Sequence, residues 1–131
     1  LLCSILTATG VYNLRRAARR VTRSGSAAFV AAGMYAFSPL IWNNATQAEV
    51  FALNNFFICL ITHVTVLYLG RPDASRNGHA YWGAFLCGLG LTNQHTLVFY
   101  VLVIVLASLA SGWRRLLRPM QILLLVLLVL L

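Results

Sequence analysis

The sequence predicts an all-α fold, a polytopic bundle of transmembrane helices, on three observations. Of its 131 residues, 60% are apolar and 9% are charged, against about 25% charged in a typical soluble domain. The apolar residues form long runs separated by short clusters of arginine. Arginine supplies all ten positive charges, and the acidic residues are Glu49 and Asp73. This pattern is typical of a multi-span helical membrane protein rather than of one soluble core.

Six apolar segments are expected to form the spans of one transmembrane domain. The first is closed by RRAARRVTR, the second ends at Pro39 and Trp42, and the third follows the polar patch NNATQAE. The fourth is short, with about 13 residues, and meets the fifth at GLGLTNQHT. The fifth ends at GWRRLLRP. The expected spans are residues 1–14, 26–42, 50–69, 80–92, 97–111 and 120–131.

The arginines predict the orientation of these spans. If each segment crosses, the three arginine-bearing loops 15–23, 71–76 and 114–118 lie on one side of the membrane. The polar patches 43–49 and 93–96 lie on the other side. Loops rich in arginine stay in the cytoplasm, so we expect both polar patches to face the lumen.

The two ends of the chain predict a fragment of a longer protein, truncated at both ends. The chain opens inside one apolar segment and stops inside another, QILLLVLLVLL. Twelve helical residues cover about 18 Å, whereas the hydrocarbon layer is about 30 Å thick. Residues 1–20 also lack the order of a signal peptide, in which a basic region precedes an apolar region and a cleavage site.

Several other classes of protein are disfavoured by the sequence. A net charge of +8 could suggest nucleic acid, but basic and aromatic residues do not interleave and no zinc or helix-turn-helix spacing is present. Cys3, Cys59 and Cys87 lie in apolar runs without CxxC spacing, which favours structural thiols over disulfides or metal ligands. We therefore assign no metal-binding residues, cofactor or nucleic-acid partner, and the sequence leaves the metal dependence of any reaction open.

Two ionisable residues of the polar patches are candidates for function. An ionisable group in or beside a span is costly and by default a functional hypothesis, and Glu49 begins the third segment. Its alternative role is a solvated carboxylate that favours the N-terminal end of a helix. His95 could likewise be a loop histidine bonded to the neighbouring turn. We expect Glu49 and the segment 93–95 to line one luminal cavity.

Other polar and small residues allow both a structural and a functional interpretation. Asn55 and Thr62 share a face of the third segment, and Asn54 shares another with Gln47. Such stripes join neighbouring helices or line a substrate path. Asn44 begins an N-glycosylation acceptor, Asn-Ala-Thr, close to the membrane. Small residues four apart favour close packing of helices; they are Ala28, Ala32 and Ala36, and Ala84 and Gly88.

Two stretches resemble a family of eukaryotic multi-span protein O-mannosyltransferases. They are FSPLIWNNATQAEVFALNNFF (37–57) and GAFLCGLGLTNQHTLVFYVL (83–102). The shared features are Trp42, the run 48–51, the run 53–55 and the run 88–96. That family looks like a branch of the type C glycosyltransferases, so the resemblance implies that this chain is a fragment of such a membrane domain.

The resemblance also implies a reaction. Mannose would pass from a lipid-phosphate donor, dolichyl-phosphate mannose, to Ser or Thr hydroxyls in the endoplasmic reticulum. The partners would be membrane lipid, the donor, and acceptor glycoproteins with IPT/TIG domains, such as plexin-type receptors. The family carries an acidic motif of the type Gly-Asp-Ser-Gly-Glu in the preceding luminal loop. That motif would lie upstream of residue 1, so we expect the main catalytic Asp to be absent here.

The remaining residues would then form the supporting wall of the site, and no residue of the chain is assigned a certain catalytic role. Glu49 is the supporting candidate for orienting the acceptor or the base, and Trp42 could be a platform for the sugar. The substrate-binding candidates are Trp42, Glu49, Asn54, Asn93, Gln94 and His95. The alternatives are a transporter or channel segment, in which Glu49, Asn55 and His95 line the path, and a purely structural membrane subunit.

Overall fold

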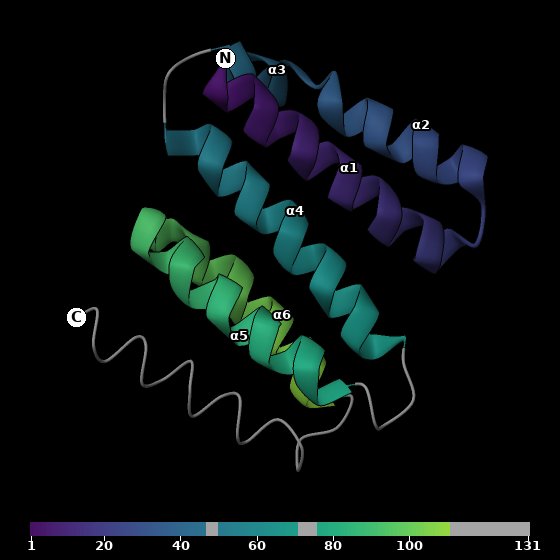
Figure 1. Ribbon diagram of the computed structural model, residues 1–131, viewed down its shortest axis with the longest axis vertical. Helices are drawn as coiled ribbons and strands as arrows, with labels where there is room; N and C mark the ends of the chain where they lie inside the picture. The colour runs from purple at the N-terminus through teal and green to yellow at the C-terminus, as the bar shows by residue number, and fades with distance from the viewer. Residues whose placement is uncertain (47–49, 71–75, 111–131) are drawn as a thin grey trace. The chain divides into compact units, whose positions relative to one another are not determined.

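The computed structural model describes residues 1–46, 50–70 and 76–110, and all regular structure in these ranges is helical (Figure 1). The chain divides into two compact units, Leu1–His63 and Val64–Leu131, which are described separately. The helices are α1 (Leu2–Thr22), α2 (Gly25–Ala36), α3 (Pro39–Thr46), α4 (Val50–Leu69), α5 (Arg76–Asn93), the 3-10 turn η2 (His95–Leu97) and α6 (Val98–Ala110). The all-α prediction is therefore confirmed for the described residues.

Helix α1 corrects the expected boundary between the first span and its arginine loop. The helix continues through Arg15, Arg16, Arg19 and Arg20 to Thr22, so the prediction of a loop at 15–23 was wrong. Alanine and arginine are strong helix formers, and the positive charges of the last turn stabilise the C-terminal end of a helix. The helix stops at Arg23, which adopts a left-handed conformation (φ 54°) and donates its N–H to the carbonyl of Arg19 at 3.0 Å.

A two-residue connection reverses the chain between α1 and α2. Ser24 follows Arg23 in an extended conformation, and its side chain accepts a hydrogen bond from the N–H of Ala27 at 3.3 Å. A serine in this position satisfies one of the free N–H groups at the start of a helix. Because the connection is short, α2 returns along α1 (Figure 1). Ala28 and Ala32 are buried, as the small-residue spacing predicts for close helix packing.

The expected second span, 26–42, is broken into two helices. Helices α2 and α3 are bent by 63° at the break between them. Pro39 has no N–H and disfavours a helical conformation at the preceding residue, so α2 ends before Ser38 and α3 starts at the proline. The break is bridged locally, because the Ser38 hydroxyl donates to the carbonyl of Tyr35 at 2.9 Å. Half of the polar patch, residues 43–46, is consequently helical.

Within the first unit, α1 and α4 pack as parallel neighbours. A Cβ atom built on Gly10 of α1 would lie 3.4 Å from Cα of Phe56 and 3.6 Å from the side chain of Cys59. Further along both helices, Asn13 meets His63. Residue numbers therefore rise in the same direction on the two helices. The α2–α3 segment, which connects them in sequence, runs back along the other side of α1 (Figure 1).

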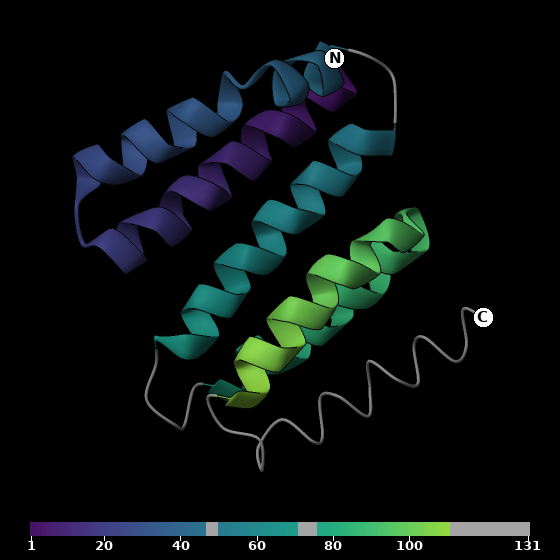
Figure 2. The same cartoon turned by 180° about the vertical axis from the view of Figure 1, so that it is seen from behind.

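The second unit contains the end of α4, a helical hairpin and its turn. Helices α5 and α6 run in opposite directions (Figure 2). Helix α5 begins at Arg76 and ends at Asn93, so it extends beyond the expected segment 80–92, and its 18 residues measure about 27 Å. A Cβ on Gly83 would contact the side chain of Val64 at 3.7 Å, which places α5 against the end of α4.

Judged by length and composition, the described helices include one candidate membrane span. It is α4, with a mean hydropathy of 1.9, and its bounds match the expected segment 50–69. The bent α2–α3 pair passes the same test only if both helices count as one span. Residues 95–110 form a shorter apolar helix. The expected segment 120–131 lies outside the described residues, and the six-span bundle stays a prediction.

Replacing Gly10 with leucine should weaken the first unit. A Cβ at this position would already touch Cα of Phe56 at 3.4 Å and the side chain of Cys59 at 3.6 Å. The further atoms of leucine would therefore have to displace these neighbours, and overpacking a tight contact costs about 1–3 kcal/mol. Gly33→Leu is the matched control, since a Cβ there meets nothing within 4 Å and leucine is the better helix former. Thermal unfolding of the purified protein in detergent would measure both, and an equal loss of stability in both variants would contradict the close contact.

Candidate functional site

The predicted polar patch begins at Trp42, on the first turns of α3. Its backbone N–H donates to the carbonyl of Ser38 at 2.9 Å, which fixes the residue just after the helix break. The Trp42 ring stacks on Phe37, with centroids 5.7 Å apart and planes at 24°. The indole is 56% exposed. Trp42 therefore presents an oriented aromatic surface, suited to a sugar face, a lipid chain or the membrane interface.

The far end of α3 is tied to the start of α1. The Ser4 hydroxyl donates to the carbonyl of Ala45 at 3.0 Å. Asn44, the glycosylation candidate, lies within α3 and is half-buried. The patch 43–46 thus sits beside the N-terminal end of α1, and the arginines of the same helix begin 11 residues after Ser4. Ser4 was not among the predicted site residues, because a lone serine in an apolar run carries no distinguishing signal.

Three buried polar atoms lie near this end of the first unit without a hydrogen-bond partner in the described residues. They are Oγ1 of Thr7, Oδ1 of Asn54 and Nδ2 of Asn55. Thr7 is one helical turn before Gly10, and Asn55 is one turn before Cys59, so these atoms border the α1–α4 contact on its Trp42 side. Buried polar atoms are nearly always paired. Their lack of partners marks this region as a candidate site for a polar ligand.

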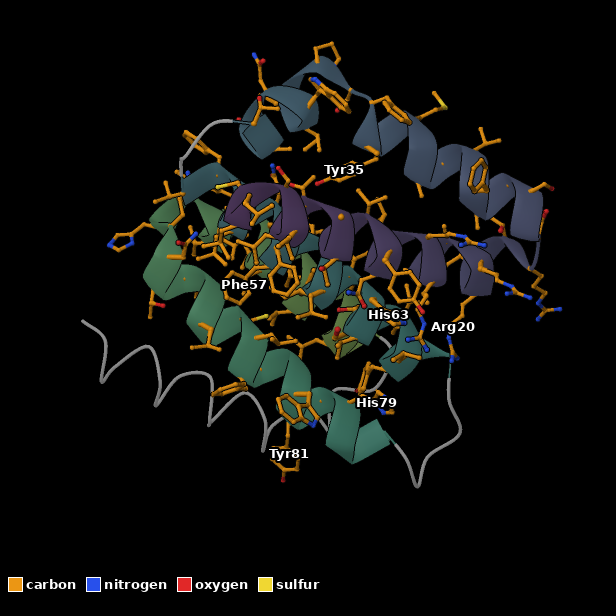
Figure 3. All side chains as sticks on the ribbon, turned by 45° about the horizontal axis from the view of Figure 1, so that its top comes forward. Arg20, Tyr35, Phe57, His63, His79 and Tyr81 are labelled. Atoms are coloured by element: carbon orange, nitrogen blue, oxygen red, sulfur yellow. The ribbon has the colours of Figure 1, made fainter. Side chains whose placement is uncertain are left out.

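Deeper along the same contact, α1 and α4 are joined by a buried hydrogen bond. Nδ1 of His63 lies 2.9 Å from Oδ1 of Asn13, and His63 is 5% exposed. The Asn13 amide donates its Nδ2 to the carbonyl of Thr9 at 2.9 Å, so its Oδ1 accepts and Nδ1 of His63 carries the proton. Figure 3 shows His63 within the helices of the first unit, and Arg20 toward the end of α1.

Neither Asn13 nor His63 was predicted as a site residue. The available signal was one amide in the first apolar run and one histidine in the third, each among several other polar residues. Such residues in membrane helices usually face another helix and bond across it. Sequence spacing identifies the polar residue but not its partner 50 positions away.

The stretch GLGLTNQHT, residues 88–96, contains less irregular backbone than the sequence suggested. Helix α5 continues to Asn93, Gln94 is extended (φ −152°, ψ 118°), and His95 starts η2. The N–H of Gln94 still donates to the carbonyl of Gly90 at 3.1 Å. The junction is therefore a single extended residue between two helical segments, rather than a longer non-helical segment.

The three polar side chains of this junction lie in different environments. The Asn93 side chain is half-buried, and the His95 side chain is exposed. Oε1 of Gln94 is buried and has no partner among the described residues. Within this junction, the buried Oε1 of Gln94 is therefore open to a hydrogen bond from a ligand, and the exposed His95 is accessible to an approaching molecule.

The central carboxylate candidate, Glu49, lies outside the described residues, which omit 47–49. The segment 93–95 belongs to the second unit, so the cavity expected between Glu49 and this segment stays a prediction. In residues 1–46, 50–70 and 76–110, no three His, Cys, Asp or Glu side chains are grouped so as to hold a metal ion. Cys3, Cys59 and Cys87 are free thiols, and Tyr35 hydrogen-bonds the Cys59 side chain.

These features define a helical protein with at least one helix suited to a membrane, and with polar side chains collected near helix ends. Comparison with known families identifies it more closely. Residues 2–116 match the family described as the Protein O-mannosyl-transferase TMEM260 N-terminal domain. The chain belongs to the TMEM260 protein O-mannosyltransferase family.

Two relatives show how much of the family protein this chain covers. It is 41% identical over 106 residues to the Protein O-mannosyl-transferase TMEM260 of Mus musculus, an alignment that covers 80% of the chain and 15% of the relative. It is 40% identical over 83 residues to the Protein O-mannosyl-transferase tmem260 of Dictyostelium discoideum, covering 56% of the chain and 10% of the relative. No solved structure matches the chain.

The Asn13–His63 bond should contribute measurably to holding α1 against α4. Hydrogen bonds between membrane helices are worth about 0.6 kcal/mol on average, with a maximum near 1.7. A double-mutant cycle of Asn13→Leu and His63→Leu, read by unfolding of the purified protein, should give a coupling energy in this range. The control cycle combines Asn13→Leu with Thr62→Val. The Thr62 hydroxyl donates to the carbonyl of Ile58 in its own helix, so this cycle removes a local hydrogen bond instead of the one to Asn13. A coupling energy no larger than that of the control would contradict the bond.

Proposed function

We propose that this chain is part of the membrane domain of a protein O-mannosyltransferase of the endoplasmic reticulum. The reaction would transfer mannose from a lipid-phosphate donor, dolichyl-phosphate mannose, to Ser or Thr hydroxyls of secretory-pathway proteins. The observation that carries the proposal is the family match over residues 2–116, with 41% identity to the mouse relative. Membership of this family favours sugar transfer over the alternatives of a transporter, a channel or a structural subunit.

The first unit supports a luminal site and a cytoplasmic arginine cluster. The last turns of α1 carry four arginines and Arg23 follows them. Trp42, Ala45 and the partnerless atoms of Thr7, Asn54 and Asn55 lie toward the start of α1. If α1, the α2–α3 pair and α4 cross the membrane in turn, α1 and α4 must run in the same direction and α2–α3 in the opposite one. The packing of the first unit has this geometry. Large apolar side chains on α2, on α3 and at the break between them are exposed, as expected for helices that face lipid; they include Phe29, Val30, Met34, Phe37 and Leu40.

The chemistry assigns different tasks to the polar residues. An acceptor hydroxyl needs a general base, normally a carboxylate within hydrogen-bond reach. Glu49 is the carboxylate on the proposed luminal side, since Asp73 lies in the arginine-bearing segment 71–76. We assign Glu49 a supporting role in orienting the acceptor or the base, and we place the main base in a part of the protein outside residues 1–131.

Donor binding requires partners for sugar hydroxyls and for the charge of the leaving lipid phosphate. The amides of Asn54 and Gln94 suit sugar or phosphate oxygens, because each can donate and accept hydrogen bonds. His95, exposed beside Gln94, could donate to a phosphate oxygen. Trp42 would offer its ring to the sugar or the lipid chain. The acceptors proposed from the family resemblance are glycoproteins with IPT/TIG domains.

The proposed orientation predicts the accessibility of two introduced cysteines. In a protein whose native cysteines are replaced by alanine, Ala45→Cys should react with a membrane-impermeant thiol reagent from the luminal side. Ser75→Cys should react from the cytoplasmic side, because arginine-rich segments stay in the cytoplasm. Labelling of both cysteines from the same side would contradict the arrangement of crossings between residues 45 and 75.

Substitution of the two ionisable residues should lower mannose transfer. In the full-length protein, His95→Ala and Glu49→Gln should each reduce the rate about ten-fold or more. The reason is that a hydrogen bond to a charged group is worth roughly 1.5–3 kcal/mol, and about 1.4 kcal/mol is a factor of ten in rate. The measurement is transfer of mannose from the lipid-phosphate donor to an IPT/TIG-domain acceptor.

The matched control for the histidine is His79→Ala. His79 lies near the start of α5, 14 residues and about 21 Å along the helix from Asn93, and its replacement should leave transfer close to the wild-type rate. Membrane insertion of each variant is measured in parallel. Wild-type transfer by both His95→Ala and Glu49→Gln would show that the polar patches serve only the structure.

A further inference from the structure

The last turns of α1 carry an exposed basic face. Arg15, Arg16, Arg19 and Arg20 are all exposed, and at 3.6 residues per turn they occupy an arc of about 140°. Arg23 follows directly at the helix end and is also exposed. The buried Ala17, on the same turns, falls outside this arc. We call Arg15, Arg16, Arg19, Arg20 and Arg23 the basic face.

Two aromatic side chains, one on α1 and one on α2, lie next to arginines of the basic face. The guanidinium of Arg16 lies 5.8 Å from the ring centroid of Tyr12, and that of Arg15 lies 5.9 Å from the ring of Phe29 on α2. Both rings are more than half exposed. Aromatic rings with adjacent cations are typical of the boundary between hydrocarbon and lipid headgroups.

The basic face has no acidic side chain nearby in the sequence. Residues 1–48 contain neither aspartate nor glutamate. The first carboxylate along the chain, Glu49, follows the α3 end of the unit, which Ser4 ties to the opposite end of α1. Neither carboxylate of the chain, Glu49 or Asp73, lies among the described residues, so no described acidic side chain neutralises the five positive charges.

We propose that the basic face binds the headgroup phosphates of anionic phospholipids in the cytoplasmic leaflet. This inference rests on the membrane orientation under the proposed function. Arginine forms paired hydrogen bonds with phosphate oxygens, and basic residues beside a membrane helix attract anionic lipids. The exposed rings of Tyr12 and Phe29 favour a lipid partner over a soluble phosphate compound, because they place apolar surface directly beside the charges.

The test is lipid retention by the purified full-length protein. The protein is delipidated in detergent, titrated with phosphatidylinositol or with the neutral phosphatidylcholine, and analysed by native mass spectrometry. We expect preferential retention of phosphatidylinositol. A basic residue near an anionic surface contributes about a five-fold change in binding, so Arg19→Gln with Arg20→Gln should weaken phosphatidylinositol retention by roughly 25-fold. Equal retention of the two lipids by the wild-type protein would overturn the proposal.

The matched control is Arg114→Gln with Arg115→Gln, which removes the same charge from another arginine cluster of the sequence. It should retain phosphatidylinositol nearly as well as the wild type. The same loss in both double variants would assign the effect to net charge and overturn the proposal.

Salt gives a measurement that needs no variant. Raising the ionic strength from about 0.1 M to about 1 M shortens the screening length from about 10 Å to about 3 Å. Phosphatidylinositol retention by the wild type should fall steeply, and retention that does not change with salt would overturn the proposal. Because the assay measures binding alone, its failure leaves mannose transfer unaffected, and a failed transfer assay leaves lipid retention unaffected.

Discussion

The close parallel contact between α1 and α4 is the interaction on which the first unit depends. Glycine at position 10 lets the backbone of α1 approach Phe56 and Cys59 within van der Waals distance. In the proposed membrane arrangement, lipid removes the hydrophobic attraction between helices, so close packing and interhelical hydrogen bonds would hold α1 and α4 together. Gly10 allows the close packing, and the Asn13–His63 pair, one turn further along, forms the interhelical hydrogen bond.

Polar atoms without partners lie toward the start of both helices in this contact. Thr7 precedes Gly10 on α1, and Asn54 and Asn55 precede Phe56 on α4. The Ser4–Ala45 bond then brings α3 and Trp42 toward the same end. A site proposed at this position would be bordered by α1 and α4 and by the α3 helix.

Much of this arrangement could be predicted from sequence because composition determines it. The helix 50–69 is apolar throughout and bounded by polar residues, and its bounds were predicted correctly. The break at Ser38–Pro39 was missed, since a proline near a segment end also suits a continuous span. The arginine turns of α1 were taken as a loop because charge was given more weight than the helix propensity of alanine and arginine.

Pairings between distant residues could not be predicted. Sequence placed Asn54, Gln94 and His95 among the candidates by residue type and neighbourhood, but the environment of each depends on which helix lies beside it. Asn13 and His63 show the same limit, because each is ordinary alone and the pair exists only through the packing of α1 on α4. Family membership adds the activity of the relatives, which no single side chain in this chain reveals.

The rotational setting of α1 has a consequence for how the first unit can move. Gly10, Asn13 and Ala17 direct one side of the helix toward buried surroundings, while the four helical arginines occupy a different side. Rolling α1 about its axis would turn guanidinium groups into the contact with α4, or toward hydrocarbon in the proposed membrane arrangement, and either placement is costly. The break between α2 and α3 carries no charged side chain, and its bending is limited by the Ser4–Ala45 bond between α3 and α1. Bending at Phe37–Ser38 is therefore less costly than rolling α1.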